Sequence, residues 1–77
     1  MENRLKKVFS DIFDLPLENI DDNLSPDTVD EWDSLNHSNL VVALEQEFGV
    51  SFSPDEIIEM MNFQLVNIIV RDKFTKK

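Results

Sequence analysis

The first periodic pattern in the chain lies close to its N-terminus. Between Glu2 and Asp14, apolar residues recur at spacings of three and four, which is typical of a helix with one buried face. We expect this helix to end before Pro16, because the residue that precedes a proline is pushed out of helical geometry. The apolar face consists of Leu5, Val8, Phe9, Ile12 and Phe13.

Residues 15–33 show no helical period and include two prolines. A loop of this length is uncommon in a small domain unless something ties it to the core. Apolar residues are spaced along it in a way that predicts such ties. The expected anchors are Leu15, Leu17, Ile20, Leu24, Val29 and Trp32.

Three further helices are predicted after this loop. The first runs from about Ser34 to Phe48 and is stopped by Gly49. A short helix follows Ser53, where Ser-Pro-Asp-Glu predicts a capping box, and should reach about Met61. The last spans Phe63 to about Lys73; its β-branched residues also suit a strand, but the chain offers no partner strand. The prediction is an all-α bundle of three longer helices and one short helix, forming one domain over residues 1–77.

The balance of charge restricts the possible partners. The net charge is −9, from 16 acidic and 7 basic residues, and no Lys or Arg occurs between Asp11 and Val70. Such a surface repels nucleic acid and anionic membranes and attracts a partner with a basic patch. No apolar run is long enough for a membrane span, and the N-terminus does not resemble a signal peptide. We therefore expect a monomer in the cytoplasm.

Catalytic and metal-binding functions find little support in the sequence. The absence of cysteine excludes disulfides, thiolate nucleophiles and cysteine metal sites. A hydrolase built on Asp33, Ser34 and His37 would need an oriented base and an oxyanion hole, and neither is indicated. A calcium loop starting at Asp21 would need Gly and Glu where the chain has Pro26 and Trp32, so no metal site is expected.

The helix that begins near Ser34 has two distinct faces. At about 100° per residue, its core side carries His37, Leu40, Val41, Leu44 and Phe48. The opposite side is predicted to be exposed although it includes two aliphatic residues. That side carries Leu35, Ser38, Asn39, Val42 and Gln46, with Glu45 at its margin.

The start of this helix permits two interpretations of Ser34. Either Asp33 or Ser34 is the N-cap, accepting a hydrogen bond from an unpaired backbone N–H. Alternatively, the serine hydroxyl is an attachment point, since a helix start favours a bound phosphate.

The sequence Asp33-Ser34-Leu35, followed by the residues LVVALEQEF from Leu40 to Phe48, resembles the acyl carrier protein family. The resemblance extends over nearly the whole chain and implies a non-catalytic carrier. Ser34 matches the serine that receives 4′-phosphopantetheine from coenzyme A, and the thiol of this arm carries acyl or aminoacyl groups as thioesters. Asp33 matches the aspartate that helps to hold Mg²⁺ transiently in the transferase complex.

The resemblance also implies a set of partners. These are the phosphopantetheinyl transferase, an acyl- or aminoacyl-loading enzyme and downstream acyl-processing enzymes. Leu35, Val42 and Glu45 match family positions that partner enzymes contact. We extend the predicted partner surface to Ser38, Asn39 and Gln46.

Some residues depart from the pattern of fatty-acid carriers. Glu31 stands where glycine is usual, and Trp32 follows it. The sequence WDSL with a following Asn-His is instead reminiscent of specialised free-standing carriers. The alternative is an acidic helical protein-interaction module that binds partners through the same face and never carries a cofactor.

Overall fold

The structure is a computed structural model that describes residues 2–76. Within that range all regular secondary structure is helical and no strand is present, which confirms the predicted all-α bundle. The observed ends lie within three residues of the predicted ones: the first helix stops one residue earlier, the third two residues earlier, and the last extends three residues further. The elements are α1 (Glu2–Phe13), the 3-10 turn η1 (Leu17–Asn19), α2 (Ser34–Phe48), α3 (Pro54–Glu59) and α4 (Phe63–Lys76).

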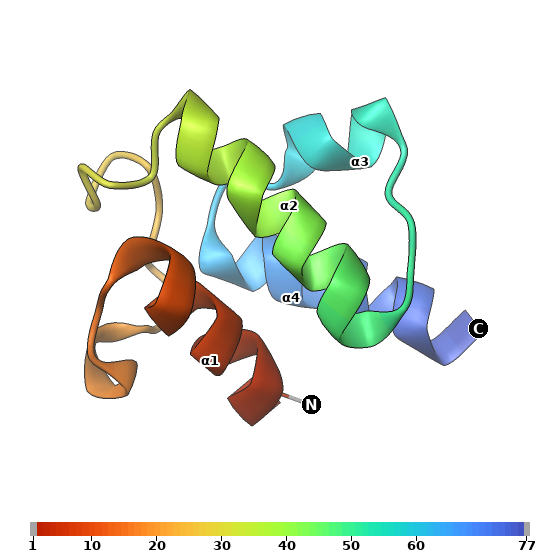
Figure 1. The fold of residues 1–77 in the computed structure, drawn as a ribbon, viewed down its shortest axis with the longest axis horizontal. Helices are drawn as coiled ribbons and strands as arrows, with labels where there is room; N and C mark the ends of the chain where they lie inside the picture. Colours follow the sequence, from red (N-terminus) through yellow and green to blue (C-terminus); the bar gives the residue numbers. More distant parts are fainter. Residues whose placement is uncertain (1, 77) are drawn as a thin grey trace.

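Helix α2 crosses the middle of the molecule, with α1 below it, α4 behind it and α3 above it in Figure 1. The centre of the core is aromatic. The ring of Phe9 on α1 lies 5.6 Å from Phe13, 5.5 Å from Trp32 and 4.9 Å from Phe63, measured between ring centroids. This cluster joins α1, the long loop and α4, so the loop is part of the core rather than an appendage.

Two helices end in left-handed backbone conformations. Gly49 has φ 64°, and its N–H donates to the carbonyl of Glu45, which ends α2 where the sequence predicted. Asp14 has φ 55° and ends α1. Aspartate tolerates this region better than most residues, which explains why α1 ends one residue before the predicted boundary.

The long loop between α1 and α2 is anchored much as predicted, with one exception. Ile20, Leu24, Val29 and Trp32 are buried, and Leu15 packs partly buried against the core. The prediction for Leu17 was wrong, because this side chain is exposed. Leu17 is the first residue of η1, a surface turn that follows the extended Pro16, and the chain returns to the core only at Ile20.

Hydrogen bonds to backbone carbonyls of this loop also fasten it to the helices. The N–H of Phe63, at the start of α4, donates to the carbonyl of Leu24 at 2.8 Å. The side-chain amide of Asn36 on α2 donates to the carbonyl of Glu31 at 2.8 Å. The loop therefore reaches α2 with its last residues held in place.

Arg4 joins the start of α1 to the end of α2. Its Nε donates to the carboxylate of Glu47 at 2.9 Å, and its Nη2 donates to the carbonyl of Glu47 at 2.7 Å. The guanidinium also lies over the rings of Phe48 and Phe74. A basic group thus lies at the C-terminal end of α2, about 20 Å along the helix from Ser34.

The predicted capping box at α3 is present and gives a pH-dependent contribution to stability. The backbone N–H of Ser53 donates to Glu56 at 2.8 Å, and Lys73 lies 2.9 Å from the same carboxylate. The hydrogen bond from Ser53, followed by the contact with Lys73, lowers the pKa of Glu56 below its ordinary value of 4.5. A lowered folded-state pKa stabilises the fold above the unfolded-state pKa, and this stabilisation is lost as the pH falls through the folded-state value.

Replacement of Glu56 by Gln should therefore matter more at neutral pH than in acid. Glutamine retains the geometry of a capping box but cannot ionise. We expect Glu56→Gln to melt below the wild type at pH 7 and to approach it in an acidic buffer in which the lowered pKa of Glu56 has been passed and the carboxylate is protonated. Thermal melts followed by circular dichroism at both pH values test this, and a difference that stays constant would show that ionisation of Glu56 plays no part.

Candidate functional site

Asp33, and not Ser34, caps α2. Asp33 has an extended backbone, and its Oδ1 accepts a hydrogen bond from the N–H of Asn36 at 2.9 Å. Ser34 is the first helical residue, its side chain is exposed, and its hydroxyl makes no hydrogen bond within residues 2–76. The structure therefore decides between the two capping alternatives, and it leaves the Ser34 hydroxyl exposed and without a hydrogen-bond partner in the described chain.

The buried side chain of Trp32 anchors the start of α2 in the core. This side chain is only 3% exposed, and its ring lies 5.2 Å from that of Phe13 and 5.5 Å from that of Phe9. Because Trp32 immediately precedes the capping residue, burial of the indole fixes where α2 begins. The sequence predicted Trp32 as a loop anchor but did not predict that it supports the site.

His37 lies one turn after Ser34, at the edge of the core. Its Nδ1 accepts a hydrogen bond from Trp32 Nε1–H at 3.0 Å, and its Nε2 lies 3.0 Å from the carbonyl oxygen of Ile57. An indole N–H can only donate and a carbonyl can only accept, so these contacts require a neutral ring with its proton on Nε2. Both ring nitrogens are engaged, and neither is free to take a proton from Ser34.

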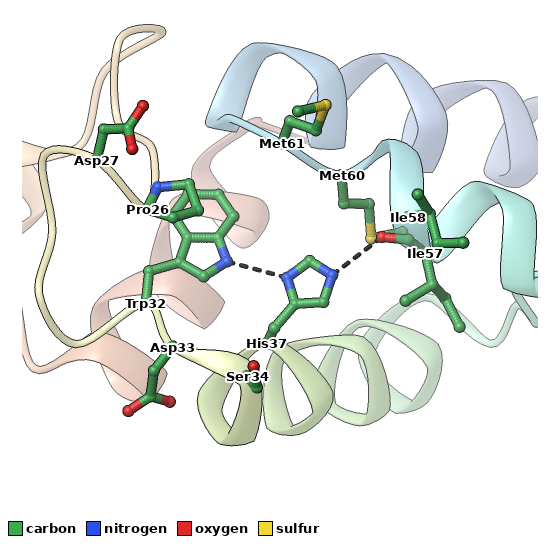
Figure 2. Close-up of a pocket in the computed structure, with 10 residues that line it drawn as sticks. All are labelled: Pro26, Asp27, Trp32, Asp33, Ser34, His37, Ile57, Ile58, Met60 and Met61. Carbon is green, nitrogen blue, oxygen red and sulfur yellow. Dashed lines mark hydrogen bonds between the residues drawn. The ribbon is translucent and has the colours of Figure 1, made fainter.

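A groove of about 620 Å³ opens beside Ser34 between the loop and α3 (Figure 2). Asp27 and Asp33 bring carboxylates to it, whereas Lys and Arg are absent from its lining. The remaining lining is largely apolar. The groove is lined by Pro26, Asp27, Trp32, Asp33, Ser34, His37, Ile57, Ile58, Met60 and Met61.

The predicted partner face of α2 points away from the core. Leu35 is 71% exposed, Val42 is also exposed, and Ser38, Asn39 and Gln46 lie on the same open side. Glu45 differs, since it is half-buried and its Oε2 accepts a hydrogen bond from the N–H of Phe52 at 2.9 Å. The carboxylate of Glu45 therefore already helps to hold the connection between α2 and α3.

Sequence reasoning missed two apolar residues beside the groove. Ile58 is 74% exposed and Met61 is also exposed, although both belong to the segment that was expected to pack as a helix. A signal for Ile58 was present in the sequence. Ile57 and Ile58 are adjacent in a short helix, so only one of them can face the core. Both line the groove to which Ser34 also contributes, and the exposed Leu35 directly follows Ser34 on α2.

Two kinds of feature are absent from residues 2–76. No group of three or more His, Cys, Asp or Glu side chains is arranged to hold a metal ion. No helix in this range is both long and apolar enough to cross a bilayer.

Comparison with known families identifies the class of protein that this fold and site define. The family described as the phosphopantetheine attachment site matches residues 3–65. The chain therefore belongs to the phosphopantetheine-attachment family, which includes the acyl carrier proteins, and it is a phosphopantetheine-carrying protein. A search of curated proteins returned no match.

The capping role of Asp33 leads to a prediction about stability. Asp33→Ala removes the acceptor for the Asn36 N–H and should lower the free energy of unfolding by about 1 kcal/mol. Asp33→Asn retains a side-chain oxygen and should cost only a few tenths of that amount. Urea unfolding of both variants tests the assignment, and equal losses in the two would contradict a capping role.

Proposed function

We propose that this protein is an acyl carrier protein in which 4′-phosphopantetheine is attached to the Oγ of Ser34. The observation that carries the proposal is the exposed hydroxyl at the first residue of α2, which has no hydrogen-bond partner within residues 2–76 because Asp33 supplies the cap. The unpaired N–H groups and the dipole of a helix start favour a phosphate at this position. When attached, the arm supplies the thiol that this cysteine-free chain lacks.

The chain's own residues would present this serine rather than react on the cargo. Trp32 and Asp33 hold the start of α2, so that Ser34 projects from a rigid helix end into solvent. Asp33 is also the residue that would help to hold Mg²⁺ in the complex with the transferase. A phosphopantetheinyl transferase, an enzyme that loads an acyl or aminoacyl group and downstream acyl-processing enzymes are the partners of such a carrier.

The proposed partner surface begins at Leu35 and follows the exposed side of α2. Exposed apolar side chains provide contact area, and the acidic surface around them favours partners that carry basic residues. The three described ion pairs place Arg4, Lys6 and Lys73 against acidic residues, so these cations are already partly neutralised. The surface consists of Leu35, Ser38, Asn39, Val42, Glu45 and Gln46, with Ile58 and Met61 added from the structure.

The experiment that tests the proposal is a measurement of intact mass. The purified chain is incubated with coenzyme A, Mg²⁺ and a broad-specificity phosphopantetheinyl transferase. We expect the mass of the chain to rise by one phosphopantetheine group. An unchanged mass, with an established carrier protein modified in parallel, would refute the proposal in favour of a cofactor-free interaction module.

A further inference from the structure

His37 connects three parts of the molecule beside Ser34. It lies on α2, it accepts a hydrogen bond from Trp32 at the end of the loop, and it donates one to the carbonyl of Ile57 on α3. Figure 2 shows Trp32 and Ile57 on either side of the imidazole, with Ser34 close to it on the same helix. Trp32, His37 and Ile57 all line the groove, so the two hydrogen bonds span it from the loop to α3.

Helix α3 has no fully buried side chain of its own, although Phe52 before it and Met60 after it lie in the core. It has only six residues. The capping box stabilises its first turn, and the contact of Glu56 with Lys73 joins that turn to α4. The middle of α3 is joined directly to α2 by the bond from His37 to Ile57. A short helix with few buried contacts belongs to the least stable part of a structure and moves readily when a tie is removed.

We propose that His37 is a positioning residue that sets the width of the groove beside Ser34, holding α3 near the loop until its two hydrogen bonds break. The neutral ring with its proton on Nε2 is the only form that satisfies both partners at once. Movement of α3 away from the loop must break at least one of the bonds. The cost of that break opposes entry of an apolar chain into the groove.

This role rests on the proposed carrier function, because the apolar group that enters the groove would be the acyl chain carried at Ser34. The walls contributed by Ile57, Ile58, Met60 and Met61 are apolar, so an alkyl chain is the cargo they suit best. His37 would then adjust how much of a tethered acyl chain is sheltered by the protein and how much is left exposed to partner enzymes.

Variants at position 37 separate this role from simple packing. His37→Gln retains one acceptor and one N–H donor, so it can preserve both bonds. His37→Ala removes both bonds. His37→Asn is too short to reach both partners and takes the place of the alanine variant if the latter does not fold. Thermal melts establish which variants are folded at the temperature of the assay.

The assay measures how far the protein protects the thioester from a reagent in solution. Each protein is loaded with an octanoyl-phosphopantetheine arm from octanoyl coenzyme A, and cleavage of the thioester by hydroxylamine is followed by intact mass. We expect cleavage in the alanine variant to be about fivefold slower than in the wild type, which is the effect of removing roughly one net hydrogen bond from the closed state. The glutamine variant should match the wild type. Equal cleavage rates in all three proteins, or an alanine-like rate in the glutamine variant, would overturn the proposal.

A second measurement on the unmodified chain distinguishes failure of this inference from failure of the carrier function. The chain has one histidine and one tryptophan, so each gives a single set of ring ¹⁵N signals. We expect the proton on Nε2 of His37 and a hydrogen-bonded indole N–H for Trp32. A proton on Nδ1 would overturn the positioning role and leave loading untouched, whereas a chain that cannot be loaded would overturn the carrier function and leave this bond network intact.

Discussion

Ser34→Ala should abolish attachment of phosphopantetheine while leaving the fold intact. We expect a complete loss of attachment, because the proposed reaction uses the Ser34 oxygen itself and alanine has none. The structure adds that the loss cannot be attributed to unfolding, since the cap of α2 is Asp33 and the Ser34 hydroxyl makes no hydrogen bond in the described chain. The measurement is intact mass after incubation with coenzyme A and transferase, together with a thermal melt.

Ser51→Ala is the matched control for this experiment. Ser51 is an exposed serine in the connection between α2 and α3, outside both the groove and the proposed partner surface. It should be loaded as the wild type is, with a melting temperature within a few degrees, because surface substitutions usually change stability by less than about 0.5 kcal/mol. If Ser34→Ala still gained mass, the attachment point would lie elsewhere and the proposed site would be wrong.

Phe9→Ala should unfold most of the protein at physiological temperature. The Phe9 side chain is 0% exposed and contacts the rings of Phe13, Trp32 and Phe63, so its removal leaves a cavity where α1, the loop and α4 meet. Such a truncation costs about 3–5 kcal/mol. The total stability of a domain this small is often of the same size. Thermal and urea unfolding followed by circular dichroism measure the loss.

Leu35→Ala provides the comparison for this substitution. It also removes a large apolar side chain, but from a site that is 71% exposed. Its free energy of unfolding should change by less than about 0.5 kcal/mol. A Phe9→Ala variant that melted close to the wild type would show that the aromatic cluster does not hold the loop to the helices.

The two substitutions should also differ in their effects on function. Leu35 belongs to the proposed partner surface, whereas Phe9 is wholly internal. Leu35→Ala should therefore weaken the interaction with the transferase in a folded chain, and Phe9→Ala should lower loading only in proportion to the unfolded fraction.

The pattern of apolar residues was enough to predict the helices and most of the core. Four of the five residues predicted on the apolar face of α1 are buried, and the fifth, Ile12, packs partly buried against the core. The core side of α2 was also predicted correctly from Leu40 to Phe48, and the capping box at Ser53 formed as expected. These features depend on local periodicity and on residues close together in the chain, so they can be inferred without knowing the fold.

Irregular segments were harder to predict for a physical reason. Leu17 has the same apolar character as Ile20, but in a loop no regular repeat relates sequence spacing to direction, and Leu17 faces solvent. The exposure of Met61 was missed for the same reason, since α3 ends at Glu59 and leaves Met61 in a connection.

The sequence by itself determined the all-α class, the positions of the helices and, through the motif around Ser34, the family of the protein. Each of these depends on residues that lie close together in the chain. Only the tertiary structure decided that Asp33 caps α2 and leaves the Ser34 hydroxyl without a partner, and that His37 links Trp32 to Ile57 across the groove. Asp33 and Ser34 are equally plausible caps until the backbone direction at the helix start is known. Twenty positions separate His37 from Ile57, and no local pattern encodes a contact that forms only when α3 packs beside α2.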